Sequence, residues 1–170
     1  MAKVAFVLAD DFEDSEFAVP YQRVTGAGHE ALVIGKEKGQ EVKGKRSRET
    51  FVIEATADQV DAAEFDALVV PGGYSPDKLR TDPGIVALVK AIDDAGKPIA
   101  FICHAGSLLV EADIVRDRTV TSWPSVKTDL INAGANWVDR EVVEDANLIS
   151  SRRPDDLDAF TAALLARLST

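Results

Sequence analysis

The sequence predicts a doubly wound α/β sandwich, in which a mostly parallel central sheet carries helices on both faces. Short apolar strands recur along the 170 residues, and segments with apolar residues at helical spacing separate them. Strands that alternate with helices form parallel sheets, because each right-handed crossover returns the chain to the same edge. We see no internal repeat, low-complexity segment or linker rich in Ser, Pro or Gly. We therefore expect one domain over residues 1–170.

The expected strands are continuously apolar and cover residues 4–9, 31–34, 65–70 and 98–102. The expected helices carry apolar residues at helical spacing and cover residues 17–25, 84–95, 108–112 and 154–168. Between the second and third strands, charged residues with Gly39 and Gly44 precede the apolar Phe51-Val52-Ile53. This pattern favours a small β-hairpin excursion from the sandwich.

Composition limits the class of protein. The hydrophobic fraction of 46% is ordinary for a globular chain. No apolar run is long enough to cross a bilayer, and no signal-peptide pattern follows Met1, so we expect a cytoplasmic protein without a membrane partner. One cysteine cannot form an internal disulfide, and it excludes a zinc site built from cysteines.

Charge argues against nucleic acid as a partner. The formal net charge of -10 opposes binding to a phosphate backbone. A basic cluster, formed by Lys43, Lys45, Arg46 and Arg48, is diluted by neighbouring glutamates and is expected on a solvated hairpin. Neither a GxGxxG nor a GxxxxGK pattern follows any strand, so nucleotide binding has no direct support.

Cys103 lies where an apolar strand turns into a helical segment. A thiol at a helix N-terminus has its thiolate favoured by the helix dipole and by free backbone amides, and the thiolate is the nucleophile. A free cysteine is also commonly a small buried hydrophobe. This segment alone leaves both a reactive and an inert thiol open.

Three segments are expected to meet beyond the carboxyl ends of the strands, where such sheets bind ligands. They are residues 10–14, the tripeptide Pro71-Gly72-Gly73, and Cys103-His104. Because Gly72 and Gly73 lack side chains, their amides can approach a ligand oxygen and form an oxyanion hole with the His104 amide. By itself, the tripeptide is more typical of a tight turn after a strand.

Two side chains are candidates to move protons at the thiol. Glu13 follows the first strand and helps a thiolate only as a neutral acid, since a carboxylate would raise the pKa of the cysteine. The other acids nearby, including Glu16, are expected to be mostly solvated residues at the helix start. His104 acts as a base only if the turn beside Cys103 is sharp and a third group orients it, and structural packing of His104 is the alternative.

Several motifs, in order along nearly the whole chain, resemble the PfpI-type intracellular peptidase family, in the superfamily that includes the Parkinsonism-associated deglycase. The segments are Asp11-Phe12-Glu13-Asp14 with Glu16, residues 65–73, Gly96-Lys97-Pro98, Ile102-Cys103-His104, Thr121-Ser122-Trp123-Pro124, Asn132-Ala133-Gly134-Ala135 and Ser150-Ser151-Arg152. The resemblance implies a flavodoxin-like sandwich, a nucleophilic Cys103 on a strained elbow, a protonated Glu13 and a histidine partner at His104. It also implies a homo-oligomer, a dimer or a hexamer, because the acid that orients the histidine comes from an adjacent subunit at the position of Asp77.

Two residues depart from the family's pattern. Asp77 resembles a replacement for a glutamate of the archaeal peptidases and is one methylene shorter. Trp123 stands where a tyrosine is expected, so a hydroxyl is lost and a bulky apolar wall is gained. Both departures bear on peptidase activity in particular.

The leading hypothesis is a stress-protective enzyme of the glyoxalase III or protein deglycase type, which needs no metal or organic cofactor. Cys103 would add to the aldehyde of methylglyoxal, of glyoxal or of their early adducts on proteins. The amides of Gly72, Gly73 and His104 would hold the oxyanion while Glu13 and His104 move protons. The alternatives are an intracellular cysteine peptidase and a redox-sensing stress protein in which Cys103 is oxidised beside Glu13.

Overall fold

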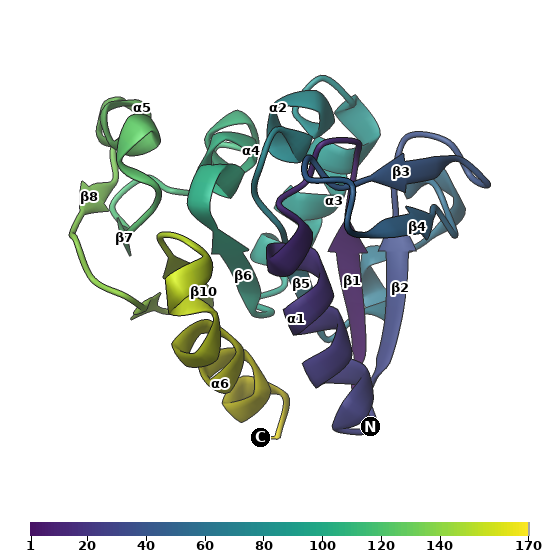
Figure 1. Cartoon of the computed structure of the whole chain (residues 1–170). Helices are drawn as coiled ribbons and strands as arrows, with labels where there is room; N and C mark the ends of the chain where they lie inside the picture. Colours follow the sequence, from purple (N-terminus) through teal and green to yellow (C-terminus); the bar gives the residue numbers. More distant parts are fainter. Residues whose placement is uncertain (170) are drawn as a thin grey trace.

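A computed structural model describes residues 1–169, and a six-stranded sheet forms its centre (Figure 1). The strand order is β2-β1-β5-β6-β10-β9, and all neighbours are parallel except β10 and β9. The strands are β1 (Lys3–Val7), β2 (Glu30–Ile34), β5 (Ala67–Val70), β6 (Ile99–Ile102), β9 (Val143–Asp145) and β10 (Leu148–Ser151). The flavodoxin-like doubly wound sandwich expected from the sequence is confirmed.

Helices cover both faces of the sheet (Figure 1). Helices α1 (Asp14–Gly26) and α6 (Leu157–Leu168) pack together on one face, and α2 (Ser75–Leu79), α3 (Pro83–Asp94), α4 (Gly106–Glu111) and α5 (Lys127–Asn132) lie on the other side. Successive side chains of a strand point to opposite faces. Val4 and Phe6 of β1 therefore join the apolar cluster beneath α1 and α6, whereas Ala5 and Val7 join the cluster beneath α3 and α4.

Two short strand pairs extend from the sandwich. The predicted hairpin is confirmed as β3 (Glu41–Lys43) and β4 (Thr50–Val52), and β7 (Thr119–Val120) pairs with β8 (Asn136–Trp137). The sequence analysis did not assign β10 a strand, because two of its four buried residues are serines and the apolar run is short. The hydroxyl of Ser150 is satisfied by the backbone N–H of Thr121 at 3.0 Å, which makes its burial tolerable.

One edge strand of the sheet is covered by another segment, and the other edge strand is short. At the β2 edge, the backbone N–H of Val33 donates to the carboxylate of Glu54 at 2.8 Å, and the Val33 carbonyl accepts from the Glu54 N–H at 3.0 Å. At the other edge, β9 has three residues, and its Glu144 forms an ion pair with Arg167 of α6 at 3.1 Å. A neighbouring strand therefore finds little free backbone at either edge.

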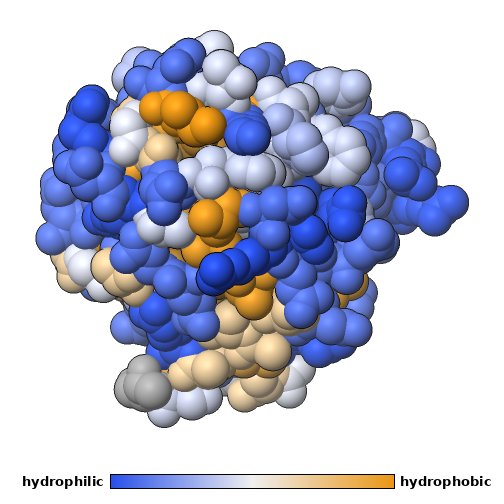
Figure 2. Space-filling model, turned by 90° about the vertical axis from the view of Figure 1, so that its left-hand side faces the viewer, coloured by the Kyte–Doolittle hydropathy of each residue, from blue (hydrophilic) through white to orange (hydrophobic). Residues whose placement is uncertain are grey.

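The outer surface is mostly hydrophilic on the face shown in Figure 2, where apolar side chains lie in small separate patches. Tyr74 and Trp123, near the carboxyl ends of β5 and β6, are among the exposed large apolar side chains. Within residues 1–169, no helix is both long enough and apolar enough to serve as a membrane span.

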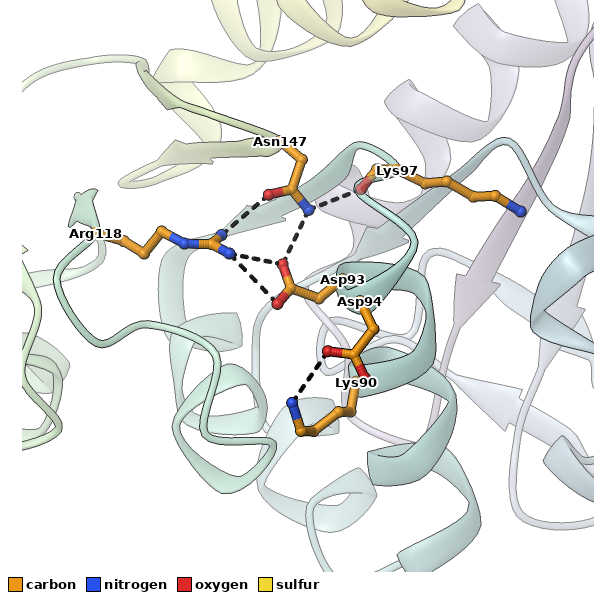
Figure 3. A network of polar contacts seen from close by, with 6 residues as sticks. All are labelled: Lys90, Asp93, Asp94, Lys97, Arg118 and Asn147. Atoms are coloured by element: carbon orange, nitrogen blue, oxygen red, sulfur yellow. Dashed lines mark hydrogen bonds and ion pairs between the residues drawn. The ribbon is translucent and has the colours of Figure 1, made fainter.

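A buried polar network joins the amino-terminal ends of β6, β7 and β10 to helix α3 (Figure 3). The Arg118 guanidinium donates to Asp93 and Asn147 at 3.0 Å each. The Asn147 amide donates to Asp93 at 3.0 Å and to the Lys97 carbonyl at 2.9 Å. Because the Asp93 side chain is only 9% exposed, its charge depends on these donors.

Replacing Asp93 with Ala is expected to lower the free energy of unfolding by about 2–4 kcal/mol, because a half-buried guanidinium and an amide lose their shared acceptor. Urea unfolding measures the difference. Asp94→Ala is the matched control, since Asp94 forms an exposed pair with Lys90 on the same helix and is expected to contribute below about 1 kcal/mol. Equal losses in the two variants would contradict a structural role for the network.

Candidate active site

Cys103 occupies a sharp turn between β6 and α4. Its φ of 64° lies in the left-handed region, which side-chain-bearing residues rarely adopt. The turn continues as a single 3-10 turn, Cys103–Ala105, before α4 begins at Gly106. Strand β6 and its neighbours hold this conformation, which places the thiol at the carboxyl edge of the sheet. Strained residues of this kind are common at functional sites.

Gly72 allows a carboxyl group to reach this turn. A Cβ at position 72 would lie 2.4 Å from Oε1 of Glu16 and 2.8 Å from Cβ of Cys103, so only glycine fits between them. The Gly72 N–H donates to Oε1 of Glu16 at 3.0 Å. The carboxyl of Glu16 also hydrogen-bonds with the Cys103 thiol. Glu16, Gly72 and Cys103 thus form one closely packed unit.

The carboxyl beside the thiol is a neutral acid. Burial raises the pKa of Glu16 to about 8, and the negative charge of Glu13 adds to the increase. Glu16 is completely buried, and its Oε2 has no separate hydrogen-bond partner in the described part of the chain. At neutral pH the group therefore carries a proton that it can donate toward sulfur or toward a bound oxygen.

The structure assigns a different environment to Glu13, which the sequence analysis placed beside the thiol as the protonated acid. The Glu13 carboxylate lies 2.9 Å from Nζ of Lys45 and 3.7 Å from Nε of Arg46. Glu13 thus forms ion pairs with the hairpin, whereas Glu16 is the acid whose carboxyl hydrogen-bonds with the thiol. The placement of the acid is corrected from Glu13 to Glu16, three residues further along the chain.

The spacing of the buried residues along α1 explains why Glu16 points into the molecule. Glu16, Pro20 and Val24 follow one another at spacings of four residues and are all buried, so Glu16 lies on the sheet-facing side of α1. The expectation that Glu16 is a solvated helix-start acid is therefore wrong. Asp14 departs from the same expectation, because its carboxylate is buried and accepts three backbone N–H groups of the hairpin.

The electrostatic surroundings of the thiol combine opposing effects. Burial is the largest effect and raises the pKa of Cys103 well above its usual range overall, and a charge on Glu16 adds to the increase. The sequence expectation that the turn favours the thiolate is therefore not met in this single chain. The backbone N–H groups of His104 and Gly73 hydrogen-bond to the sulfur and lower the pKa, as does the charge of Lys45. The thiolate thus depends on a neutral Glu16, on two amides and on one ammonium group.

The three amides expected to form an oxyanion hole differ in their hydrogen-bond partners. The Gly73 and His104 amides point at the sulfur, next to the position of a reacting atom. The Gly72 amide is already bound to Glu16 and is not free for a substrate oxygen. Gly73 has a φ of 77°, and a Cβ there would meet the backbone N of Glu13 at 2.4 Å, so both glycines are required for the close approach of the chain segments.

His104 and Trp123 lie next to each other near Cys103. Their rings stack with centroids 6.3 Å apart and an interplanar angle of 22°, and the backbone N–H of Trp123 donates to the Cys103 carbonyl at 3.0 Å. Burial and the charge of Lys45 both lower the pKa of His104, so its imidazole is neutral at pH 7. Within residues 1–169, no hydrogen bond or ion pair orients that ring.

Asp77 lies in the first turn of α2 with an exposed side chain. The described part of this single chain does not join it to His104. Asp77 and Tyr74 instead face outward from the segment that follows Gly73. An exposed carboxylate at this place is available to another molecule.

Lys45 lies on the exposed β3–β4 hairpin, as the sequence predicted, and it also contacts the site. Its backbone N–H donates to the Phe12 carbonyl at 2.8 Å and its ammonium pairs with Glu13. Residues far apart in sequence bring it here, so no local pattern marks it. In the described residues, no group of three or more His, Cys, Asp or Glu side chains is arranged to hold a metal ion.

The fold and this site define a flavodoxin-like sandwich that carries a cysteine on a strained turn between a strand and a helix. The chain belongs to the DJ-1/PfpI family, whose model matches residues 2–167. The sequence resemblance is thereby confirmed.

Relatives of known name align over nearly the full chain. Protein/nucleic acid deglycase 2 of Escherichia coli is 44% identical over 98% of this chain and 97% of its own. General stress protein 18 of Bacillus subtilis is 45% identical with the same coverage. A putative cysteine protease of B. subtilis, YraA, is 42% identical over 93% of each chain. These names indicate an enzyme of this family.

Solved structures agree with the fold. A two-domain protein of Anabaena variabilis, containing DJ-1/ThiJ/PfpI-like and ferritin-like domains, superposes with a TM-score of 0.98 at 40% identity and covers 99% of this chain and 48% of that one. A ThiJ/PfpI domain protein of Brachyspira murdochii has a TM-score of 0.92 at 25% identity, covering 98% of this chain and 96% of its own.

Glu16→Gln tests the neutral carboxyl. The pKa of Glu16 rises on folding from 4.5 to about 8, so between these pH values the folded state binds a proton that the unfolded state has lost. The stabilisation that comes from this proton is fully present below pH 4.5 and is lost as the pH rises through about 8. Between about pH 4.5 and about pH 9, the free energy of unfolding should fall by about 3–5 kcal/mol more in the wild type than in Glu16→Gln.

Urea unfolding at the two pH values measures this difference. Glu111→Gln is the control, since it removes an exposed carboxylate that pairs with Arg80 and should follow the wild type. If Glu16→Gln and the wild type respond equally to pH, the carboxyl of Glu16 is not held neutral by the fold.

Proposed function

We propose that the protein is a stress-protective, cysteine-dependent enzyme that acts on reactive carbonyl compounds, with Cys103 as nucleophile and Glu16 as general acid. The observation that carries this proposal is the neutral Glu16 carboxyl packed against a thiol on a strained turn. Addition of a thiolate to an aldehyde creates an alkoxide, and a proton donor beside the sulfur is what that step needs.

The reaction can be written for methylglyoxal with all atoms accounted for. His104 takes the thiol proton, the sulfur bonds to the aldehyde carbon, and the former carbonyl oxygen takes the proton of Glu16. The Glu16 carboxylate then removes the hydrogen of that carbon as a proton, and the imidazolium returns a proton to the neighbouring carbon through an enediol. The aldehyde carbon is thereby oxidised and the ketone carbon reduced, which gives a lactyl thioester. Water hydrolyses the thioester to lactate and restores the thiol.

Two further observations support a small carbonyl substrate. Cys103 is only 7% exposed, so a small aldehyde reaches the sulfur more readily than the backbone of a folded polypeptide does. Relatives at 42–44% identity carry the name deglycase, which supports early carbonyl adducts on side chains as substrates too. Peptide hydrolysis, suggested by the name of the B. subtilis relative, is the alternative reaction of the same thiol.

We also propose that the working form is a homo-oligomer in which Asp77 of one subunit orients His104 of another. His104 lacks an orienting acid within the described chain, and Asp77 is exposed. A histidine that moves protons needs a partner that fixes its ring. The contribution of a neighbouring subunit supplies that partner without any change in the fold.

Cys103→Ala is expected to reduce lactate production from methylglyoxal by about 10³-fold or more, because no other thiol exists in the chain. The assay uses a buffer without primary amines and blanks with free thiols. Cys103→Ser, which keeps the size of the side chain, should be equally inactive. Turnover retained by folded Cys103→Ala protein would refute a thiol mechanism, and Cys103-dependent peptide hydrolysis without lactate would favour the peptidase.

Mixing two impaired variants tests the shared site. Asp77→Ala should lower turnover by about tenfold or more, since His104 loses its orienting acid. Co-assembly of Asp77→Ala with Cys103→Ala subunits should restore about a quarter of the wild-type activity, because some sites then combine an intact thiol with an intact acid from the neighbour. Activity equal to the mean of the separate variants contradicts a site shared between subunits.

A further inference from the structure

Two cations of the hairpin share one carboxylate near the thiol. Lys45 and Arg46 lie 2.9 Å and 3.7 Å from the carboxylate of Glu13. In the described residues neither side chain forms an ion pair with any other acid. The Lys45 side chain is one-third exposed and the Arg46 side chain is more than half exposed, so both remain open to a ligand.

A built frame holds these two cations in place. The buried carboxylate of Asp14 accepts the backbone N–H groups of Arg46, Arg48 and Glu49 at 2.9 Å each. A Cβ on Gly44 would overlap the Asp14 carboxylate, so the backbone at Gly44 packs directly against this carboxylate and leaves no room for a side chain. The loop is therefore a fixed part of the site, which lowers the conformational cost of binding a ligand there.

Contacts of Glu13 connect this loop to the thiol. The Glu13 N–H donates to the Gly72 carbonyl at 3.1 Å, and Gly72 lies directly against Cys103. The charge of Lys45 acts on Cys103, Glu16 and His104 alike. A cavity of about 250 Å³ beside Glu13 is lined by Arg46 and Arg48 and also by Glu13, Asp14 and Glu49, so its charges are mixed. The carboxylate of Asp14 is already bound by three backbone N–H groups of the loop.

We propose that Lys45 and Arg46 form a subsite for an anionic group of the substrate, so that carbonyl compounds carrying a carboxylate or a phosphate are bound in preference to neutral ones. This inference rests on the proposed thiol chemistry and adds the substrate class. Ammonium and guanidinium groups bind carboxylate and phosphate oxygens by strong charge-assisted hydrogen bonds. In a chain of net charge -10, anions are otherwise repelled, so two partly exposed cations that share one carboxylate offer an anionic group a local binding site.

Alkylation of Cys103 tests the subsite without requiring turnover. The same thiolate attacks iodoacetate, which is an anion, and iodoacetamide, which is neutral. The ratio of the two alkylation rates, iodoacetate over iodoacetamide, therefore reports binding of an anion near the thiol. The fraction of Cys103 present as thiolate affects both rates equally and does not change the ratio. In Lys45→Gln this ratio should fall by about fivefold. Lys45→Arg should restore most of it, and Glu13→Gln should raise it because the shared carboxylate charge is removed.

Lys43→Gln is the matched control, since it removes one charge from an exposed position of the same hairpin. Its ratio should stay within about twofold of the wild type, and added salt should reduce the wild-type preference. An unchanged ratio in Lys45→Gln, or an equal fall in Lys43→Gln, overturns the subsite. Normal reaction with iodoacetamide in that case leaves the thiol proposal standing, whereas a Cys103 that reacts with neither reagent contradicts both.

Competing ions separate the two kinds of anionic group. Acetate and inorganic phosphate are added, at equal ionic strength, to the alkylation by iodoacetate. Stronger protection by acetate identifies a carboxylate subsite, and stronger protection by phosphate identifies a phosphate subsite. In Lys45→Gln both protections should weaken by about fivefold. Protection by neither ion contradicts the proposal.

Discussion

The packing of the Glu16 carboxyl against the Cys103 thiol is the constraint on which the rest of the site depends. It requires Gly72, because any side chain there would fill the space that the two groups share. It requires a left-handed turn at Cys103, which directs the sulfur toward the carboxyl and toward the Gly73 and His104 amides. A charged carboxyl in this position would oppose the thiolate, so the burial that keeps Glu16 neutral is part of the chemistry.

The hairpin completes the site from a distant part of the sequence. Asp14, at the start of α1, fixes the loop by accepting three of its N–H groups. Burial acts to raise the pKa of Asp14, but these hydrogen bonds outweigh it and lower the pKa overall, so the carboxylate stays charged. One turn of α1 thus contains carboxyls in opposite states. Asp14 is an anion that holds the loop, and Glu16 is a neutral acid beside the sulfur.

Much of this architecture could be predicted from the sequence, and the reasons for the exceptions are physical. Continuous apolar strands such as Ala67–Val70 and amphipathic helices such as Pro83–Asp94 carry their pattern locally, so the sheet and its helices were recognisable. Strand β10 escaped because buried serines replace apolar residues. The convergence of the strand ends, and Cys103 on its elbow, followed from the rule that ligands bind at that edge.

The acids were harder to assign, because four of them lie within six residues and their environments come from tertiary contacts. Glu13 and Glu16 differ by less than one helical turn, yet one meets two cations and the other meets a thiol. The four-residue spacing of Glu16 from Pro20 was a usable signal for burial. Nothing local to Lys45 marked it as part of the site, since its contacts with Phe12 and Glu13 span more than thirty residues.

The closed edges of the sheet affect how copies of the chain can meet. Glu54 occupies the backbone of β2 that a further strand would use, and β9 offers only three residues at the other edge. Strand-to-strand extension, the usual route by which sheets join into fibres, therefore has no ready starting point. A sheet closed in this way also offers little template for the exposed strands of other, partly unfolded chains.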